Sequence, residues 1–526
     1  MNLTFLTPVV CCILITETVE RFAYFGFRAI LVLYFIHALK VNEDNAIALY
    51  AYVTCLAYAS PILGSLMADA YWGRYKTILI FGWIYAIGLS LLTIGACVDD
   101  DRNDLKRVLS FIGLFFFCMG TGGIKPCVSA FGADQVASLE KTVVADCTIS
   151  LETGPGSSTT SSERVRAFFS LFYFCINLGA VTSISSIPIV KLHFGFGAAF
   201  LAPTIFIVIA MLTFWSKRNE YVHIAPGQDG RSLSMTLALC IWMIRKDLAR
   251  TWLCRLYPGI IPKRSPMSGS DEEDDANQQL NDAKQVLRVL PIMSMFPIFW
   301  MLYDQQSSVW TLQATRMKLH GLQAEQLIVV NPVEIMIFIP LFDHVIYPFL
   351  ERIGMKVSHL SRMRWGMFFT AISFSISGLV EYWIQNSEEH SISVFWQLPQ
   401  ITILAVAEIL VSVTGLEFAY AMSPERLKAL IMGVYLVMTS IGNLFGGLLY
   451  SSIFQSLNRV IVMEVCAILM LLNLAIFCWV GKGWEKLKLH DTSADFEQNT
   501  VELACKEQSP ASNEYSAIVI KGYEVD

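Results

Sequence analysis

The chain carries few charged residues for its length. Asp, Glu, Lys and Arg make up 16% of its 526 residues, against about 25% in a typical soluble domain. Apolar residues make up 55%, and the mean hydropathy is +0.52. This balance predicts a polytopic membrane protein whose solvent is the lipid bilayer. The net charge of -6 argues against nucleic acid as a partner.

Signatures of several common site types are missing. The 13 cysteines show neither a CxxC pair nor a Cys/His ligand spacing, so no disulfide framework or zinc site is indicated. The run GTGGIKP at 120–126 lacks the Gly-Lys-Ser/Thr ending of a phosphate-binding loop. No Ser/His/Asp arrangement points to nucleophilic catalysis. We therefore expect no enzyme activity, no metal and no cofactor.

Long apolar runs predict about twelve spans, and so an all-α membrane protein with two six-helix bundles. No cationic segment with a cleavage site precedes the first run, so we expect this run to be retained as a span. The predicted spans are residues 8–38, 46–70, 76–97, 107–128, 166–190, 195–216, 286–306, 326–350, 363–384, 395–421, 428–455 and 459–481.

The spans divide the chain into four regions. They are an N-terminal bundle (1–216) with a polar insert (136–163), a linker (217–285) with an amphipathic segment (232–246), a C-terminal bundle (286–483) and a polar tail (484–526). The amphipathic segment is predicted to lie on the membrane interface. Lys and Arg gather in the loops after spans two, eight and ten, which predicts cytosolic termini, linker and insert. We expect a monomer in the plasma membrane rather than in an endolysosomal one.

The first apolar run is long enough to cross a bilayer but contains four charges: Glu17, Glu20, Arg21 and Arg28. At roughly 2.5–3.5 kcal/mol for each charge near the membrane centre, four lipid-facing charges would cost on the order of 10 kcal/mol. At about 100° per residue, the four charges and Tyr24 share one helix face. That face must meet a water-filled cavity or partners on other helices. It favours a proton-handling cluster, and a purely structural ion-pair cluster is the alternative.

Polar side chains recur inside later spans, at Lys125, Asn177, Trp300, Asp304, Asn331, Glu334, Asp343 and Glu408. Bases are concentrated in the first half of the chain and acids in the second. An elongated zwitterion would fit a cavity between them, with its carboxylate near Arg28 and Lys125 and its ammonium near Glu408. Aromatic walls would contact the middle of such a solute. For Lys125, snorkelling to the membrane interface is the alternative.

The order of these elements resembles the major facilitator superfamily, whose substrate site lies between two six-helix halves. The run GSLMADAYWGR at 64–74 is similar to the superfamily motif between spans two and three. In that motif Asp69 can cap a helix end or pair beside Arg74 at a cytosolic gate. An ordinary helix end with a basic loop would explain Arg74, but not the whole pattern.

Longer motifs resemble the proton-coupled oligopeptide transporter family, and most closely its animal di- and tripeptide carriers. Glu17-x-x-Glu20-Arg21-Phe22-x-Tyr24-Phe25-Gly26 is similar to that family's ExxERFxYYG signature. The blocks GTGGIKPCVSAFGADQ, FFSLFYFxINLGA, FWxLxDQQxSxWTLQAT and WQLPQxxxxxxxEIxxSVTGLEFxYxxSP follow in the family's order. The resemblance extends from about residue 8 to residue 481.

The resemblance implies a role for each matching residue. Proton coupling falls to Glu17, Glu20 and Arg21. Substrate binding falls to Tyr24, Arg28, Tyr58, Lys125, Asn177, Trp300, Asn331, Glu408 and, where the family has a pocket tryptophan, Tyr435. Gating falls to Asp69, Arg74 and an ion pair between Arg288 and Asp343 that breaks and re-forms.

Four positions depart from the family pattern. Phe25 lacks the hydroxyl of the second motif tyrosine, Ala51 replaces a span-two histidine, and Tyr435 replaces the tryptophan of span eleven. Glu334 is an unexpected acid, for which a structural role beside a base is the alternative. The large extracellular domain of the animal carriers between spans nine and ten is also missing, because only a short connection separates 384 from 395.

The prediction is a symporter of di- and tripeptides that uses protons as its coupling ion and works by alternating access. Lys125 and Glu408 together favour peptides over nitrate, because an anion needs no acid for an amino group. A carrier of histidine or another small solute is an alternative. A non-transporting peptide sensor is a further one, although a receptor would have no need of the ExxER cluster.

Overall fold

The structure is a computed structural model that describes residues 6–147, 157–223, 285–286, 288–354, 357–423 and 428–507. These residues are helical almost throughout and form no β-strand. The predicted interfacial segment at 232–246 lies outside the described residues. The chain divides into two compact units, Met1–Leu474 and Ala475–Asp526. The first unit contains the helices that pack around the predicted site. The second continues helix α17, which runs to Glu507.

The first unit consists of an N half (6–223) and a C half (285–474). The elements of the N half are α1 (Pro8–His37), α2 (Glu43–Ala59), α3 (Pro61–Met67), η1 (Ala68–Trp72), α4 (Gly73–Cys97), η2 (Asp100–Arg102), α5 (Asn103–Cys147) and α6 (Ser157–Ser216). Those from the C half onward are α9 (Phe296–Tyr303), η3 (Asp304–Ser307), α10 (Val309–Thr315), η4 (Ala324–Val329), α11 (Val330–Leu341), η5 (Phe342–Ile346), α12 (Tyr347–Arg352), α13 (His359–Gln385), η6 (Val394–Gln397), α14 (Leu398–Glu408), η7 (Ile409–Val413), α15 (Thr414–Ala421), α16 (Lys428–Tyr450), η9 (Phe454–Ser456) and α17 (Arg459–Glu507).

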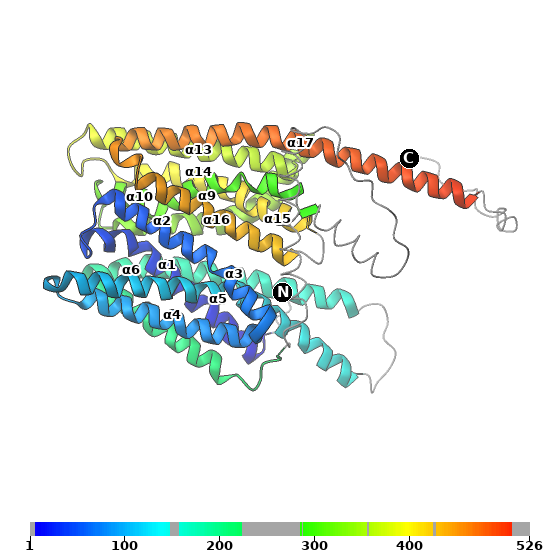
Figure 1. Ribbon diagram of the computed structural model, residues 1–526, viewed down its shortest axis with the longest axis horizontal. Coiled ribbons are helices and arrows are strands. Elements are labelled where there is room, and N and C mark those ends of the chain that lie inside the picture. The colour runs from blue at the N-terminus through cyan, green and yellow to red at the C-terminus, as the bar shows by residue number, and fades with distance from the viewer. Residues whose placement is uncertain are drawn as a thin grey trace, which may run out of the picture. The chain divides into compact units, whose positions relative to one another are not determined.

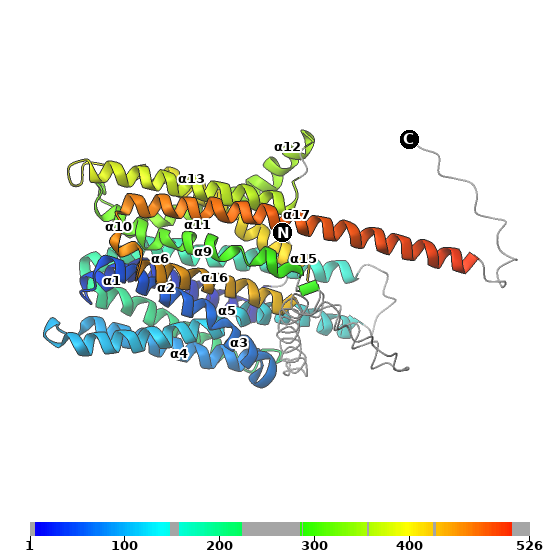
Figure 2. The same cartoon turned by 45° about the horizontal axis from the view of Figure 1, so that its top comes forward.

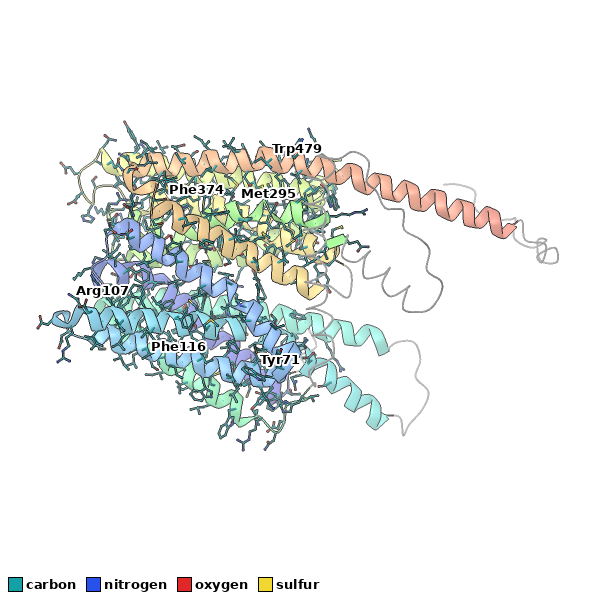
Figure 3. The ribbon with its side chains drawn as sticks, viewed as in Figure 1. Tyr71, Arg107, Phe116, Met295, Phe374 and Trp479 are labelled. Carbon is teal, nitrogen blue, oxygen red and sulfur yellow. The ribbon has the colours of Figure 1, made fainter. Side chains whose placement is uncertain are left out.

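The helices of each half lie together in both views of the ribbon, with α2 and α16 side by side where the halves meet (Figures 1 and 2). We name the two ends of the first unit after α1, as the Pro8 end and the His37 end. Arg107 marks the His37 end of the N half and Tyr71 marks its Pro8 end (Figure 3). Helix ends follow local sequence: Thr7 caps α1 by accepting from the Val10 amide at 3.3 Å, and Pro8 occupies the first turn.

Within the described residues, nine helices are long and apolar enough to cross a membrane. The sequence predicts about twelve spans, and three features of the structure explain why fewer helices are counted. Helix α1 carries four charges, and α6 contains two predicted spans joined at Gly195, where φ is +77°. The predicted span 286–306 continues as α9, η3 and α10, which are short because the chain changes helix type at Asp304. Such broken helices are typical of transporter sites.

Glycines let helices of the N half approach closely. A Cβ on Gly64 of α3 would lie 2.5 Å from the Gly122 carbonyl oxygen and 2.6 Å from Gly123 Cα, both in α5. These contacts are with backbone atoms, which cannot move aside. The glycines of the two motifs recognised in the sequence therefore pack against one another.

In the described part of the chain, three π-helical turns interrupt the spans, and each lies at a predicted site. η1 follows α3 at the gate motif, η5 contains Asp343, and η7 directly follows Glu408. π turns inside α-helices occur often at functional positions. They leave backbone bonding less regular there, so these points can deform at lower cost than a continuous helix.

Candidate functional site

The charged face of α1 is buried in the N half. Glu17, Glu20 and Arg21 are at most 4% exposed. Arg21 pairs with Glu17 at 3.1 Å and also with Glu20. Thr121 of α5 donates to Glu20 at 3.1 Å. Two carboxylates thus share one guanidinium, so the ionised cluster has one excess negative charge that a single proton would neutralise.

The Tyr24 ring lies among three cations. The guanidinium carbons of Arg21 and Arg28 are 5.6 and 5.9 Å from its centroid, and the Lys125 ammonium is 5.4 Å away. Lys125 also lies 3.8 Å from the centroid of Tyr58. Cations at such distances are attracted by aromatic rings. The structure therefore brings the two predicted carboxylate-binding residues, Arg28 of α1 and Lys125 of α5, to the same tyrosine ring.

A buried polar chain joins the two halves beside this cluster. Arg28 donates to the Tyr50 hydroxyl at 2.6 Å and pairs with Asp304 of η3. The other carboxylate oxygen of Asp304 accepts from Asn443 of α16 at 2.5 Å. All four residues are at most 8% exposed. In this conformation Arg28 is thus held by an acid of the opposite half.

A cavity of about 180 Å³ lies between the halves. Phe25, Arg28 and Asn177 line it from the N half, and Asn331 and Glu408 line it from the C half. Asn331 donates to Glu408 at 3.2 Å and accepts from Tyr303 at 3.4 Å. An acid therefore faces the cavity from one half and a base from the other, as the sequence predicts.

The two predicted pocket aromatics contact each other. The rings of Trp300 and Tyr435 meet edge to face, with centroids 6.1 Å apart. The Tyr435 hydroxyl donates to the carbonyl of Ser412 at 2.8 Å, within the π turn η7 that follows Glu408. Tyrosine at this position thus anchors α16 to η7, which a tryptophan could not do in the same way because it has no hydroxyl.

The predicted gating residues give a mixed result. Arg74 pairs with Asp134 of α5, whereas the side chain of Asp69 lies outside the described part of the structure. Arg288 and Asp343 are both exposed at the Pro8 end of the C half, and the ion pair between them stays a prediction.

Polar contacts between the halves gather at the His37 end. Lys191 of α6 pairs with Glu325 of η4, whose side chain is 1% exposed. Arg459 of α17 pairs with Asp44 of α2 at 2.8 Å and with Glu43 at 3.4 Å. Further bridges between the halves at this end are Tyr52 with Ser451 at 3.0 Å, Gln455 with Asn45 at 2.8 Å and Gln326 with the Ser185 carbonyl at 2.8 Å.

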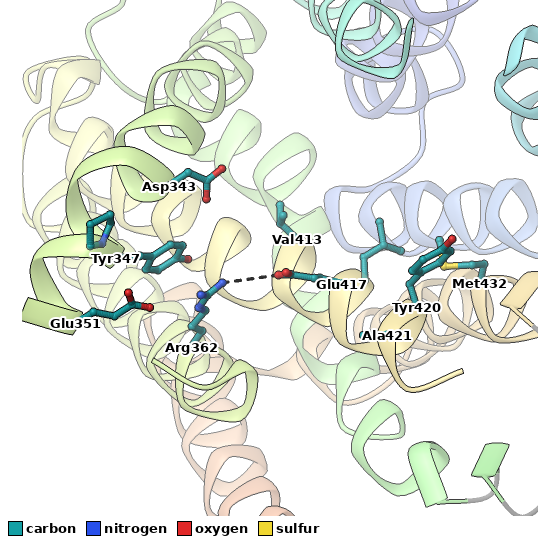
Figure 4. A pocket seen from close by; sticks show the side chains of 11 residues that line it. Asp343, Tyr347, Glu351, Arg362, Val413, Glu417, Tyr420, Ala421 and Met432 are labelled. Carbon is teal, nitrogen blue, oxygen red and sulfur yellow. Dashed lines mark ion pairs between the residues drawn. The ribbon is translucent and has the colours of Figure 1, made fainter. Parts of the chain in front are cut away.

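At the Pro8 end the C half is hollowed instead. A pocket of about 760 Å³ lies among η5, α12, α13 and α15. Asp343, Glu351 and Glu417 line it, and Arg362 pairs with Glu417 at 3.7 Å (Figure 4). The halves are therefore bridged at the His37 end, while acids of the C half stand at a hollow at the Pro8 end.

Several side chains of the site had no predicted role. Asp304 belongs to the DQQ block, and the sequence shows it only as an acid inside a span. Tyr50, Tyr303 and Asn443 lie in apolar runs, where nothing in the sequence gives their spatial partners. Asp134 lies in the quoted GADQ block, so its motif was visible, but its contact with Arg74 depends on how α4 meets α5.

The fold and the buried charges define a multi-pass membrane protein of the major facilitator type, with a polar cavity between its halves. The model of the POT family matches residues 75–465 of the chain, which is most of its length. The chain therefore belongs to the POT family. Members of this family are transporters rather than enzymes.

Curated relatives agree with this assignment. Human solute carrier family 15 member 2 is 34% identical over 415 residues, covering 77% of this chain and 53% of the relative. Peptide transporter family 1 of Drosophila melanogaster is 34% identical over 387 residues, covering 71% of this chain and 47% of the relative. The chain thus spans about half the length of these relatives.

Solved structures show the same fold. The POT family transporter PepTSo superposes with a TM-score of 0.72 at 24% identity, over 91% of this chain and 98% of that one. An auto-inhibited POT family peptide transporter gives a TM-score of 0.71 at 25% identity, over 90% of this chain and 97% of that one. The predicted all-α membrane fold with two helical bundles is confirmed.

Proposed function

We propose that this protein is a proton-coupled symporter of di- and tripeptides that works by alternating access. The observation that carries the proposal is the cavity between the halves, with Glu408 and Asn331 on one wall and Arg28 on the other. A peptide with free ends has an ammonium for the acidic wall and a carboxylate for the basic one. The peptide-transporter names of the curated relatives support the same solute class.

Each end of a peptide has a partner of opposite charge. The ammonium pairs with Glu408, which Asn331 already orients through its side-chain amide. Lys125, which contacts two tyrosine rings, supplies positive charge for the carboxylate. Arg28 joins Lys125 when its ion pair with Asp304 opens. Binding of peptide and separation of the halves at the His37 end are therefore linked through Arg28.

The α1 cluster is the proposed proton site. Glu17 and Glu20 share Arg21, so one proton removes the excess negative charge and loosens the hold on the guanidinium. Arg21 contacts the same Tyr24 ring as Arg28 and Lys125. A change in the charge of the cluster is thus felt by the two cations that receive the peptide carboxylate.

The test is uptake of a labelled dipeptide into liposomes containing the purified protein, with and without an inward proton gradient. Glu408→Gln should abolish uptake, because the ammonium loses its charge partner, whereas a carrier of small anions would be little affected. Glu20→Gln should lose accumulation driven by acid while keeping exchange of labelled for unlabelled peptide.

A matched control is Glu464→Gln. Glu464 lies in α17 of the C half and accepts from Ser375 at 3.4 Å, away from the cavity lining. It should transport as the wild type does. Peptide binding without any uptake would favour a sensor and contradict the proposal, as would wild-type accumulation in the Glu20→Gln variant.

A further inference from the structure

A second carboxyl group belongs to Glu334 of α11, which is not among the residues that line the cavity. Thr402 of α14 donates to one of its oxygens at 2.5 Å. The other oxygen is buried and has no hydrogen-bond partner among the described residues. Asn331, one turn earlier in α11, contacts Glu408 of the same α14. Two polar contacts thus join α11 to α14, Glu334 with Thr402 (the Thr402 clasp) and Asn331 with Glu408. Of these two contacts along the seam between the helices, only the one at Glu408 lines the cavity.

No base pairs with Glu334 within the described ranges of the chain. The elements packed against α11 are α6, α14, η4, η5 and η7. Their ionisable side chains in the described part of the chain are Arg164, Tyr173, Cys175, Lys191 and His193 of α6, Glu325 of η4, Asp343 and His344 of η5 and Glu408 of α14. Lys191 and Glu325 pair with each other, and His344 contacts the Pro340 carbonyl at 3.0 Å. A structural role beside a base, the alternative raised by the sequence, gains no support.

The ionised and the neutral forms of the Glu334 carboxyl need different hydrogen-bond partners. An ionised group would leave a charged oxygen buried without donor or cation, which is far more costly than burying a neutral hydroxyl. The Thr402 hydroxyl suits the carbonyl oxygen of the neutral acid equally well. The described conformation therefore favours the acid form.

We propose that Glu334 is a second proton-binding group of the transport cycle, beside the α1 cluster. It holds its proton while the Thr402 clasp is closed. It releases the proton to water, leaving the carboxylate, when α11 and α14 shift and water reaches the seam. Thr402 and Glu408 lie in the same helix, α14, so rearrangement of Glu408 around a peptide ammonium can be transmitted along α14 to Thr402. This inference rests on the proposed proton-coupled transport.

The experiment measures how many protons accompany each peptide. Liposomes are held at zero membrane potential, and the final accumulation of a neutral dipeptide is measured against the imposed pH difference. Each coupled proton contributes about tenfold accumulation per pH unit. Glu334→Gln keeps the size of the side chain and an oxygen that can accept from Thr402. It should reduce the final accumulation of the dipeptide about tenfold at a pH difference of one unit. The Glu464→Gln control should not.

An unchanged slope in Glu334→Gln would overturn the inference and leave the proposed function standing. A wild type that exchanges peptide but shows no slope would overturn both. Infrared spectroscopy provides a second readout that does not depend on transport. The wild type should show the carbonyl stretch of a protonated carboxylic acid, and Thr402→Val should shift this band because the carbonyl loses its donor. Absence of any shift would count against the assignment.

Discussion

The ion pair between Arg28 and Asp304 should stabilise the conformation in which the halves meet at the His37 end. Asp304→Asn keeps the shape of the side chain and removes its charge, which leaves Arg28 buried without a counter-ion. Breaking a buried pair in this way costs about 3–5 kcal/mol. Because the pair joins the two halves, this cost falls on the described conformation and not on one in which they have separated. The population ratio of the described conformation to the separated one should fall roughly a hundredfold to several thousandfold.

Hydrogen–deuterium exchange measured by mass spectrometry can detect this change without new cysteines in a chain that already has 13. Amides at the start of α2 and around Ser451 to Arg459 lie at the bridged end and should exchange faster in Asp304→Asn. Glu381→Gln is the matched control. Glu381 is fully buried and pairs with Arg316 at 2.7 Å, but both belong to the C half. It should lower stability without faster exchange at the start of α2.

Equal exchange of the α2 amides in both variants would refute the reasoning, because the effect of Asp304 would then be ordinary destabilisation. Removing the stranded charge should reverse part of the effect. The double variant Arg28→Gln with Asp304→Asn is therefore expected to exchange more slowly at the His37 end than Asp304→Asn alone. The coupling between the two sites is the quantity that this comparison measures.

Two further predictions concern the interface and the packing. Lys191→Gln strands the buried Glu325 carboxylate and should also speed exchange at the start of α2, with no increase in the Lys217→Gln control, whose pair with Glu220 lies within one exposed turn. Gly64→Ala should lower the melting temperature measured by fluorescence-detected size exclusion, because its Cβ would lie 2.5 Å from the α5 backbone. Gly433→Ala should not lower it, because no atom lies within 4 Å of a Cβ at that position. Equal melting temperatures of the two variants would contradict the close-packing argument.

Sequence patterns predicted the spans and the acid and base walls because both follow from the cost of placing charge in lipid. Glu17, Glu20 and Arg21 share a helix face at 100° per residue, and this face is buried as predicted. The partner of Arg28 could not be predicted in the same way. Asp304 lies 276 positions further along the chain, and the contact depends on how the halves meet. The seam between α11 and α14 is likewise a matter of helix packing, so the sequence identified Glu334 without its partner.

The contacts between the halves at the His37 end must be balanced by contacts elsewhere in the molecule. A transporter must exchange between conformations, so their free energies can differ by only a few kcal/mol. A buried pair at Arg28, a second at Lys191 and a third contact at Arg459 would hold the described conformation too firmly if nothing balanced them. Other contacts must therefore form when these open. Asp343 and Glu351 are exposed acids at the hollow of the Pro8 end, which makes them the expected C-half members of a balancing set.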